Sequence, residues 1–178
     1  MEEILITGFG EDNEKMEVLQ TSNEKTNLCH AFSNNYPRDV GVSFGALVSN
    51  QIVICGGETS ETETASCFKF DEDHTWKNFG QMSRPRSASA SVAIPDGIWV
   101  TAGAEGEDIL KTTEIIFLNG TTKPGPPLPE PRYTHCLVKY VDIIFSVGGF
   151  HRLPTRSVWI FSTRQRAFVL IPLCTSLT

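Results

Sequence analysis

Short runs of apolar and β-branched residues recur along the chain, and each run ends at a glycine doublet or its remnant. The four runs span 4–9, 52–57, 98–103 and 144–149. Their equivalent positions, Gly8, Gly56, Ala102 and Gly148, are 48, 46 and 46 residues apart. A period of roughly 40 to 50 residues with several short apolar runs per unit is typical of a β-propeller with four-stranded blades.

A second marker repeats in step with the first. It is an arginine after a proline-containing turn, at Pro37-Arg38, Pro85-Arg86 and Pro131-Arg132, with spacings of 48 and 46. Two features with one period predict an all-β chain of four-stranded antiparallel blades. The repeats are 1–36 (partial), 37–84, 85–130 and 131–178.

Alternating polarity, β-branched residues and turn residues place the strands, named A to D within a repeat. The second repeat has strands at 42–48, 51–55, 65–70 and 75–79; the third has strands at 87–94 and 113–118; the fourth has strands at 136–140, 143–147, 157–161 and 168–173. The segment 123–129 is rich in proline and lacks the backbone donors of a central strand, so we expect an outer edge or a loop.

The first repeat begins at strand B and continues with strands at 15–20 and 26–32. With its strand A missing, we expect an incomplete ring, either a fragment or a degenerate product. A complete ring of four blades is the alternative.

The aromatic residues Trp76 and Phe168 each follow the first glycine of their repeat by 20 residues. With the glycine doublets and the arginine turns in register, the chain resembles a run of Kelch repeats. The resemblance implies a structural role for the two aromatic residues, which would fill the space between neighbouring blades. It implies a structural role for the turn glycines as well, namely Gly56, Gly57, Gly103, Gly148 and Gly149. Phe9 and Ala102 depart from this pattern.

Strand direction predicts that the B–C loops and the D–A crossovers emerge on one face of the propeller. Arg38, Arg86 and Arg132 precede strand A, so we expect them to rim the central opening there. In Kelch propellers this rim commonly docks a partner peptide, and the last B–C loop adds Arg152 and Arg156. The alternative is that the three crossover arginines hydrogen-bond to backbone carbonyls or to a neighbouring carboxylate.

The first functional hypothesis is an interaction module that docks a protein or peptide. The Kelch resemblance implies roles such as cytoskeletal binding or substrate adaptor for ubiquitin ligases. In those receptors an oligomerising domain and an adaptor domain precede the propeller, and this sequence contains neither. Ligase recruitment would therefore be possible only through domains outside this sequence.

The second hypothesis is an enzyme, because some Kelch-type propellers are oxidases, isomerases or metal-dependent lyases. The four histidines are scattered without a nearby carboxylate or a ligand spacing. We therefore expect no catalytic residue, no metal site and no cofactor, and we favour the interaction module.

Composition narrows the partners further. The net charge of −6 argues against nucleic acid, whose binding depends on clustered Lys and Arg. No stretch approaches the roughly 20 apolar residues that span a bilayer, so we expect no membrane partner. The acidic start, Met1-Glu2-Glu3, lacks the features of a secretory signal, which predicts a cytoplasmic protein.

The five cysteines are an odd number and lack a Cys-x-x-Cys spacing. Cys55 and Cys67 could face each other across a hairpin. Buried thiols that pack as small hydrophobic groups are the favoured interpretation, so we expect reduced cysteines.

Overall fold

A computed structural model describes residues 2–7, 16–22, 25–32, 40–73, 75–162 and 167–171 of the protein. Throughout these ranges the regular structure is antiparallel β-sheet, without a helix. None of the described residues therefore forms a helix long and apolar enough to cross a membrane.

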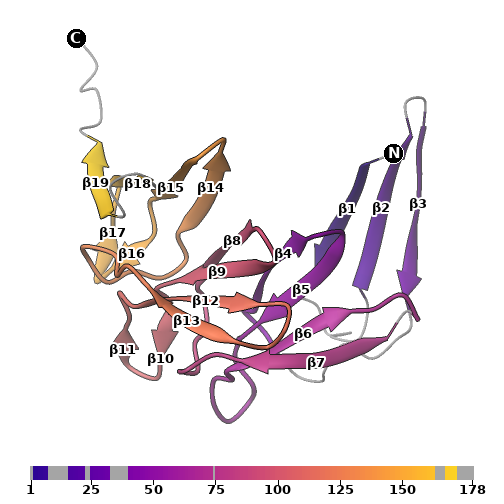
Figure 1. The fold of residues 1–178 in the computed structure, drawn as a ribbon, viewed down its shortest axis with the longest axis horizontal. Helices are drawn as coiled ribbons and strands as arrows, with labels where there is room; N and C mark the ends of the chain where they lie inside the picture. The colour runs from indigo at the N-terminus through magenta and orange to yellow at the C-terminus, as the bar shows by residue number, and fades with distance from the viewer. Residues whose placement is uncertain are drawn as a thin grey trace.

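Four antiparallel sheets follow one another along the chain (Figure 1). The first sheet has β1 (Glu2–Thr7), β2 (Met16–Ser22) and β3 (Lys25–Phe32). The second has β4 (Phe44–Val48), β5 (Gln51–Cys55), β6 (Ser66–Phe70) and β7 (Trp76–Gln81). The third has β8 (Ala90–Ile94), β9 (Gly97–Thr101), β12 (Thr113–Phe117) and β13 (Thr122–Gly125). The fourth has β14 (Cys136–Tyr140), β15 (Ile143–Val147), β18 (Val158–Ser162) and β19 (Ala167–Ile171).

Two short hairpins extend the B–C loops of the last two sheets. The hairpin of the third sheet pairs β10 (Ala104–Glu105) with β11 (Asp108–Ile109). The hairpin of the fourth sheet pairs β16 (Phe150–His151) with β17 (Leu153–Pro154). Both pairs lie outside the four-stranded sheets.

The alternation of polar and apolar residues located the strands well. The expected strands 51–55, 136–140 and 143–147 match β5, β14 and β15. The largest difference is in the third sheet, where the strand expected at 87–94 begins only at Ala90. Ser87 pairs instead with Ala104 in an isolated bridge, and Ala88 has φ of 49°, so the chain reaches the sheet later. The proline-rich segment forms β13 at the outer edge, as expected, with Pro124 opposite Glu114.

The second, third and fourth sheets are stacked face to face through their apolar sides. The first strands of three sheets adjoin, because β4 lies against β8 and β8 against β14. Figure 1 shows the sheets fanning out, with the first and the fourth at opposite ends. Across the described residues they form an open arc and not a closed ring.

Each of two described sheet-to-sheet contacts contains its own hydrophobic cluster. Between the second and third sheets the cluster includes Phe44, Val48, Val53, Ile98 and Val100. Between the third and fourth sheets it includes Ala90, Trp99, Leu137, Ile144 and Phe161, with Phe168 packed against it. The core is therefore a series of layers between sheets, which is how stacked repeats bury their apolar faces.

Each of the two aromatic residues singled out from the sequence makes a ring contact. Phe168 lies 5.8 Å from Trp99 of the third sheet between ring centroids, so it fills the space between two sheets. Trp76 lies 5.2 Å from Phe70 of its own sheet. Phe168 therefore makes the expected contact between sheets, and for Trp76 that contact stays a prediction.

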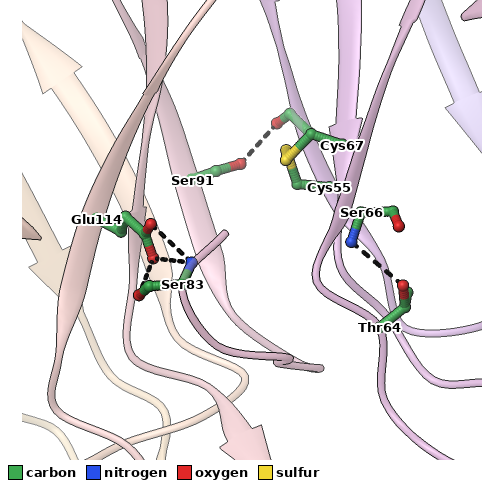
Figure 2. Close-up of a disulfide and its surroundings, with 8 residues drawn as sticks. Cys55, Thr64, Ser66, Cys67, Ser83, Ser91 and Glu114 are labelled. Atoms are coloured by element: carbon green, nitrogen blue, oxygen red, sulfur yellow. Dashed lines mark hydrogen bonds between the residues drawn. A yellow bond between two sulfur atoms is a disulfide. The ribbon is translucent and has the colours of Figure 1, made fainter. Parts of the chain in front are cut away.

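The expectation of reduced cysteines is wrong for one pair. Cys55 of β5 and Cys67 of β6 are direct partners across the strands, with Cα atoms 4.1 Å apart, and they form a disulfide (Figure 2). Both residues are buried in the layer between the second and third sheets. Among the described cysteines Cys136 is free and exposed. An odd total says nothing about one pair that the strand register brings together.

Candidate functional site

Two of the predicted docking arginines are buried. Arg86 and Arg132 lie in the crossovers before β8 and β14, with relative exposures of 1% and 0%. Arg38 lies outside the described residues. The sequence pattern therefore located two equivalent arginines correctly but did not reveal that their side chains turn inward.

Each buried guanidinium binds the base of the B–C loop of its own sheet. Arg86 donates from Nη1 to the carbonyls of Ala102 and Thr112, both at 3.0 Å. Arg132 donates from Nη1 to the carbonyl of Gly148 and from Nη2 to Ser157 Oγ, both at 2.9 Å. Ala102 and Gly148 are equivalent positions, 46 residues apart. Each arginine thus satisfies a carbonyl at the same turn.

The backbone of each arginine reaches the preceding sheet. The N–H of Gly57 donates to the carbonyl of Arg86, and the N–H of Gly103 donates to the carbonyl of Arg132, both at 2.9 Å. These glycines have φ of 110° and 95°, in the region that only glycine adopts readily. We call this repeated unit the arginine–glycine clamp, formed by Gly57 with Arg86 and by Gly103 with Arg132.

The clamp corrects the docking role expected of Arg86 and Arg132. Their side chains are buried and hydrogen-bonded to backbone carbonyls, which is the structural role that the sequence analysis gave as the alternative to docking. Burial lowers the pKa of Arg86, and the nearby Glu114 opposes this effect. An arginine remains charged in such a site because its guanidinium is the strongest base among the side chains.

A buried carboxylate anchors the crossover beside Arg86. Glu114 of β12 is 3% exposed and accepts hydrogen bonds from the N–H of Ser83, at 2.8 Å, and from Ser83 Oγ, also at 2.8 Å (Figure 2). Arg86 Nη2 lies 3.8 Å from Glu114 Oε2. The repeats do not point to this residue, because the equivalent position in the second repeat is Phe68.

The B–C loops and the crossovers share one face, as strand direction predicted. Isolated bridges join them in three sheets: Gly41 with Glu58, Ser87 with Ala104, and Tyr133 with Phe150. Both members of these pairs advance by 46 residues from one sheet to the next. Backbone hydrogen bonds therefore hold each B–C loop to the crossover beside it. We call the face that carries these loops and crossovers the loop face.

Acidic residues of the loop face are partly engaged with neighbouring loops. Glu63 accepts a hydrogen bond from the N–H of Gly106 at 2.9 Å, and Arg84 pairs with Glu105. Glu58, Glu61, Glu107 and Asp108 remain exposed on the loops of the second and third sheets. Those two loops therefore present a negatively charged surface.

The hairpin β16–β17 of the fourth sheet has the opposite character. Phe150 is 40% exposed and Leu153 is 74% exposed. Arg152 and Arg156 are also exposed, and neither guanidinium is paired within the part of the chain that the structure describes. Phe150 packs on Tyr133 with ring centroids 5.8 Å apart, which fixes the hairpin to the crossover. The hairpin thus presents two apolar side chains beside two available positive charges.

His135 is buried beneath the same face. Its Nε2 lies 2.7 Å from Thr101 Oγ1 of the third sheet. Burial, and secondarily the charge of Arg132, lowers the pKa of His135 to about 3. It is therefore neutral near pH 7 and joins two sheets. Across the described ranges, no three His, Cys, Asp or Glu side chains gather as they would to bind a metal ion.

The comparisons with known proteins concern the fold. No family model matches the sequence, and no curated protein matches it. A solved structure described as "Structure of YjhT" is similar with a TM-score of 0.70 at 11% sequence identity. The match covers 90% of this chain and 52% of that one, so this chain spans about half the length of that neighbour. The likeness supports an all-β fold built from antiparallel sheets.

Proposed function

We propose that the chain is a Kelch-type propeller segment that binds a protein or peptide partner through its loop face. The observation that carries this proposal is the hairpin β16–β17, which exposes Phe150 and Leu153 beside Arg152 and Arg156. Aromatic residues and arginines are enriched at protein interfaces. Docking on rigidly supported loops is also a common use of such scaffolds.

The charge pattern favours a partner segment of a particular chemistry. Exposed carboxylates on the second and third sheets would repel an acidic segment, whereas the hairpin of the fourth sheet would attract it. We therefore expect an extended segment with an apolar residue next to Asp or Glu, bound over β16–β17. A substrate-adaptor role, of the kind that the Kelch resemblance implies, would be one use of this docking.

The disulfide bears on where docking takes place. Structural disulfides persist mainly in oxidising compartments and are rare in the cytosol. The Cys55–Cys67 bond therefore supports an oxidising compartment, in place of the cytoplasm expected from the sequence.

Selection from a library of random displayed peptides tests the proposal. The test compares the wild-type chain with the double variant Arg152→Asn and Arg156→Gln. Asn suits position 152 because Arg152 has φ of 63°, which Asn tolerates better than most residues. The matched control is Lys123→Gln, which removes a positive charge from β13 at the far edge of the third sheet.

We expect the wild type and the Lys123→Gln control to enrich acidic–apolar peptides, and the double variant to lose that enrichment. Enrichment of the same peptides by the double variant would contradict the proposed site. A wild-type chain that enriches no peptide family would contradict docking of such segments altogether.

A further inference from the structure

The fourth sheet has one face that no other described sheet covers. Strand register places one row of side chains on the side that points away from the third sheet, and on β14 and β15 this row is Cys136, Val138, Tyr140, Ile143, Phe145 and Val147. We call this row the outer face. Val138 is 49% exposed and Tyr140 is 70% exposed. The opposite row, which includes Leu137 and Ile144, packs on the third sheet.

Residues at the equivalent positions of the two preceding sheets are less exposed. Val147 is 39% exposed, whereas Thr101 and Cys55, which lie 46 and 92 residues earlier, are 0% and 1% exposed. Tyr140 is equivalent to Val48, which is 1% exposed. The outer face therefore repeats a surface that the chain buries elsewhere. A contiguous exposed apolar surface of this kind marks an interaction site.

The third sheet shows what kind of surface covers such a row, because one of its sides packs on the equivalent row of the second sheet. In the third sheet, two antiparallel pairs contribute to the side that covers the second sheet: Ile98 opposite Ile116, and Val100 opposite Glu114. Ile98, Val100 and Ile116 all belong to the buried cluster between those sheets. An occupant of the outer face should carry a similar set of residues in the same register.

The first sheet carries that set. Ile4 and Ile6 of β1 are the repeat equivalents of Ile98 and Val100. The register of β1 and β2 places Ile4 opposite Leu19 and Ile6 opposite Glu17. These pairs reproduce the aliphatic pair and the aliphatic–glutamate pair of the third sheet. The first sheet therefore has the residue pattern of a covering sheet.

We propose that a second copy of this chain covers the outer face, with the first sheet of each copy stacked on the fourth sheet of the other. The contact joins two different surfaces, so it is heterologous, and two such contacts close a symmetric dimer. The match covers 52% of the YjhT chain, so two copies of this chain would span about the length of one such chain. The contact continues the stacking already present between the described sheets.

Sedimentation velocity over a range of protein concentrations tests the dimer. We expect the wild type to sediment with twice the mass of one chain. Val138→Asp, which places a charge on the outer face, should sediment as a monomer. Lys139→Asp introduces the same carboxylate one residue along β14, on the opposite side of the strand, and should leave the dimer intact. Circular dichroism of each variant shows that the sheets remain folded.

A mixing experiment tests which faces meet. Ile4→Asp should also give a monomer, because it alters the other side of the contact. Mixing Ile4→Asp with Val138→Asp should restore a dimer, since one of the two contacts then joins two unaltered faces. Fourth sheets meeting each other would leave Ile4→Asp dimeric, which would overturn the proposed arrangement.

Two further outcomes would overturn the second copy as occupant. One is a wild type that stays monomeric at every concentration, which would assign the outer face to a different polypeptide. The other is a wild-type dimer that Val138→Asp does not dissociate, which would place the dimer contact elsewhere.

Discussion

The backbone N–H of Gly103 donates to the carbonyl of Arg132 at 2.9 Å, and so joins the end of one sheet's second strand to the crossover that begins the next sheet. The side chain of Arg132 donates a hydrogen bond to the carbonyl of Gly148 in its own sheet. Gly148 is the repeat equivalent of Ala102, which directly precedes Gly103. The two sequence markers that share one period are thus parts of one connection. The two markers share one period because each arginine contacts the glycine turn of the preceding sheet through its backbone and the equivalent turn of its own sheet through its side chain.

Replacing a clamp arginine should destabilise the fold. Arg132→Lys should lower the free energy of unfolding by about 2 kcal/mol or more, because an ammonium group cannot reproduce the forked contact with Gly148 and Ser157. Arg156→Lys, on the exposed surface, should change it by less than about 0.5 kcal/mol. Urea denaturation of both variants checks this, and equal effects would contradict the clamp.

Two glycines with positive φ should respond differently to substitution. A Cβ on Gly57 would lie 2.6 Å from the carbonyl oxygen of Gly41, whereas a Cβ on Gly106 would have no neighbour within 4 Å. Gly57→Ala should therefore cost well over the roughly 1 kcal/mol of conformational strain expected for Gly106→Ala. Thermal unfolding of the two variants measures the difference. A milder effect at Gly57 than at Gly106 would show that the turn can relax.

The buried histidine predicts a pH dependence of stability. The pKa of His135 is about 3 in the folded state and near 6.5 when the chain is unfolded. Below pH 6.5 the unfolded state therefore binds more protons, and stability falls by up to about 1.4 kcal/mol per pH unit until the pH reaches the folded pKa. Above pH 6.5 this contribution is fully present.

The comparison of wild type with His135→Gln isolates this effect from the titration of carboxylates. The difference in unfolding free energy between the two proteins should be constant above pH 7 and should change steadily as the pH falls from 6.5 to 4.5. A difference that does not vary with pH would mean that His135 titrates alike in both states.

Reduction of the disulfide should destabilise the protein. The Cys55–Cys67 bond closes a loop with a sequence separation of 12, which corresponds to about 3 kcal/mol in the chain-entropy description. Adding a reductant should lower the unfolding midpoint of the wild type and of Cys136→Ser alike. Alkylation of the unfolded protein should modify Cys55 and Cys67 only after reduction. Modification before reduction would contradict the bond.

Much of the architecture could be predicted because equivalent positions in a repeated sequence occupy equivalent places in the fold. The strands at 51–55, 136–140 and 143–147 follow from alternation and turn residues, and the recurrence of Arg86 and Arg132 follows from their period. A period does not reveal which way a side chain points, so the burial of both arginines needed coordinates. Arg152 and Arg156 lie in a loop whose residues differ from those of the equivalent loops in the other repeats. Both are exposed, as a docking role requires.

Features that occur once were beyond the sequence. Glu114 bonds to Ser83, 31 positions away, and His135 bonds to Thr101, 34 positions away. The neighbouring repeats have neither pair of residues at the equivalent positions. The sequence left open that Cys55 and Cys67 face each other across a hairpin, and the strand register that sets them opposite decides it. Such pairings are decided by the packing of two sheets or the pairing of two strands, and no local pattern encodes them.

The most direct test of docking on the loop face is NMR titration of the isotope-labelled chain with an acidic–apolar peptide. The account predicts that amide shifts concentrate in residues 150–156, whereas the loops around Glu58 and Glu107, whose exposed carboxylates repel an acidic segment, shift little. Shifts concentrated in the turns of the opposite face, at Ser49-Asn50, Asp96 and Val141-Asp142, would contradict it.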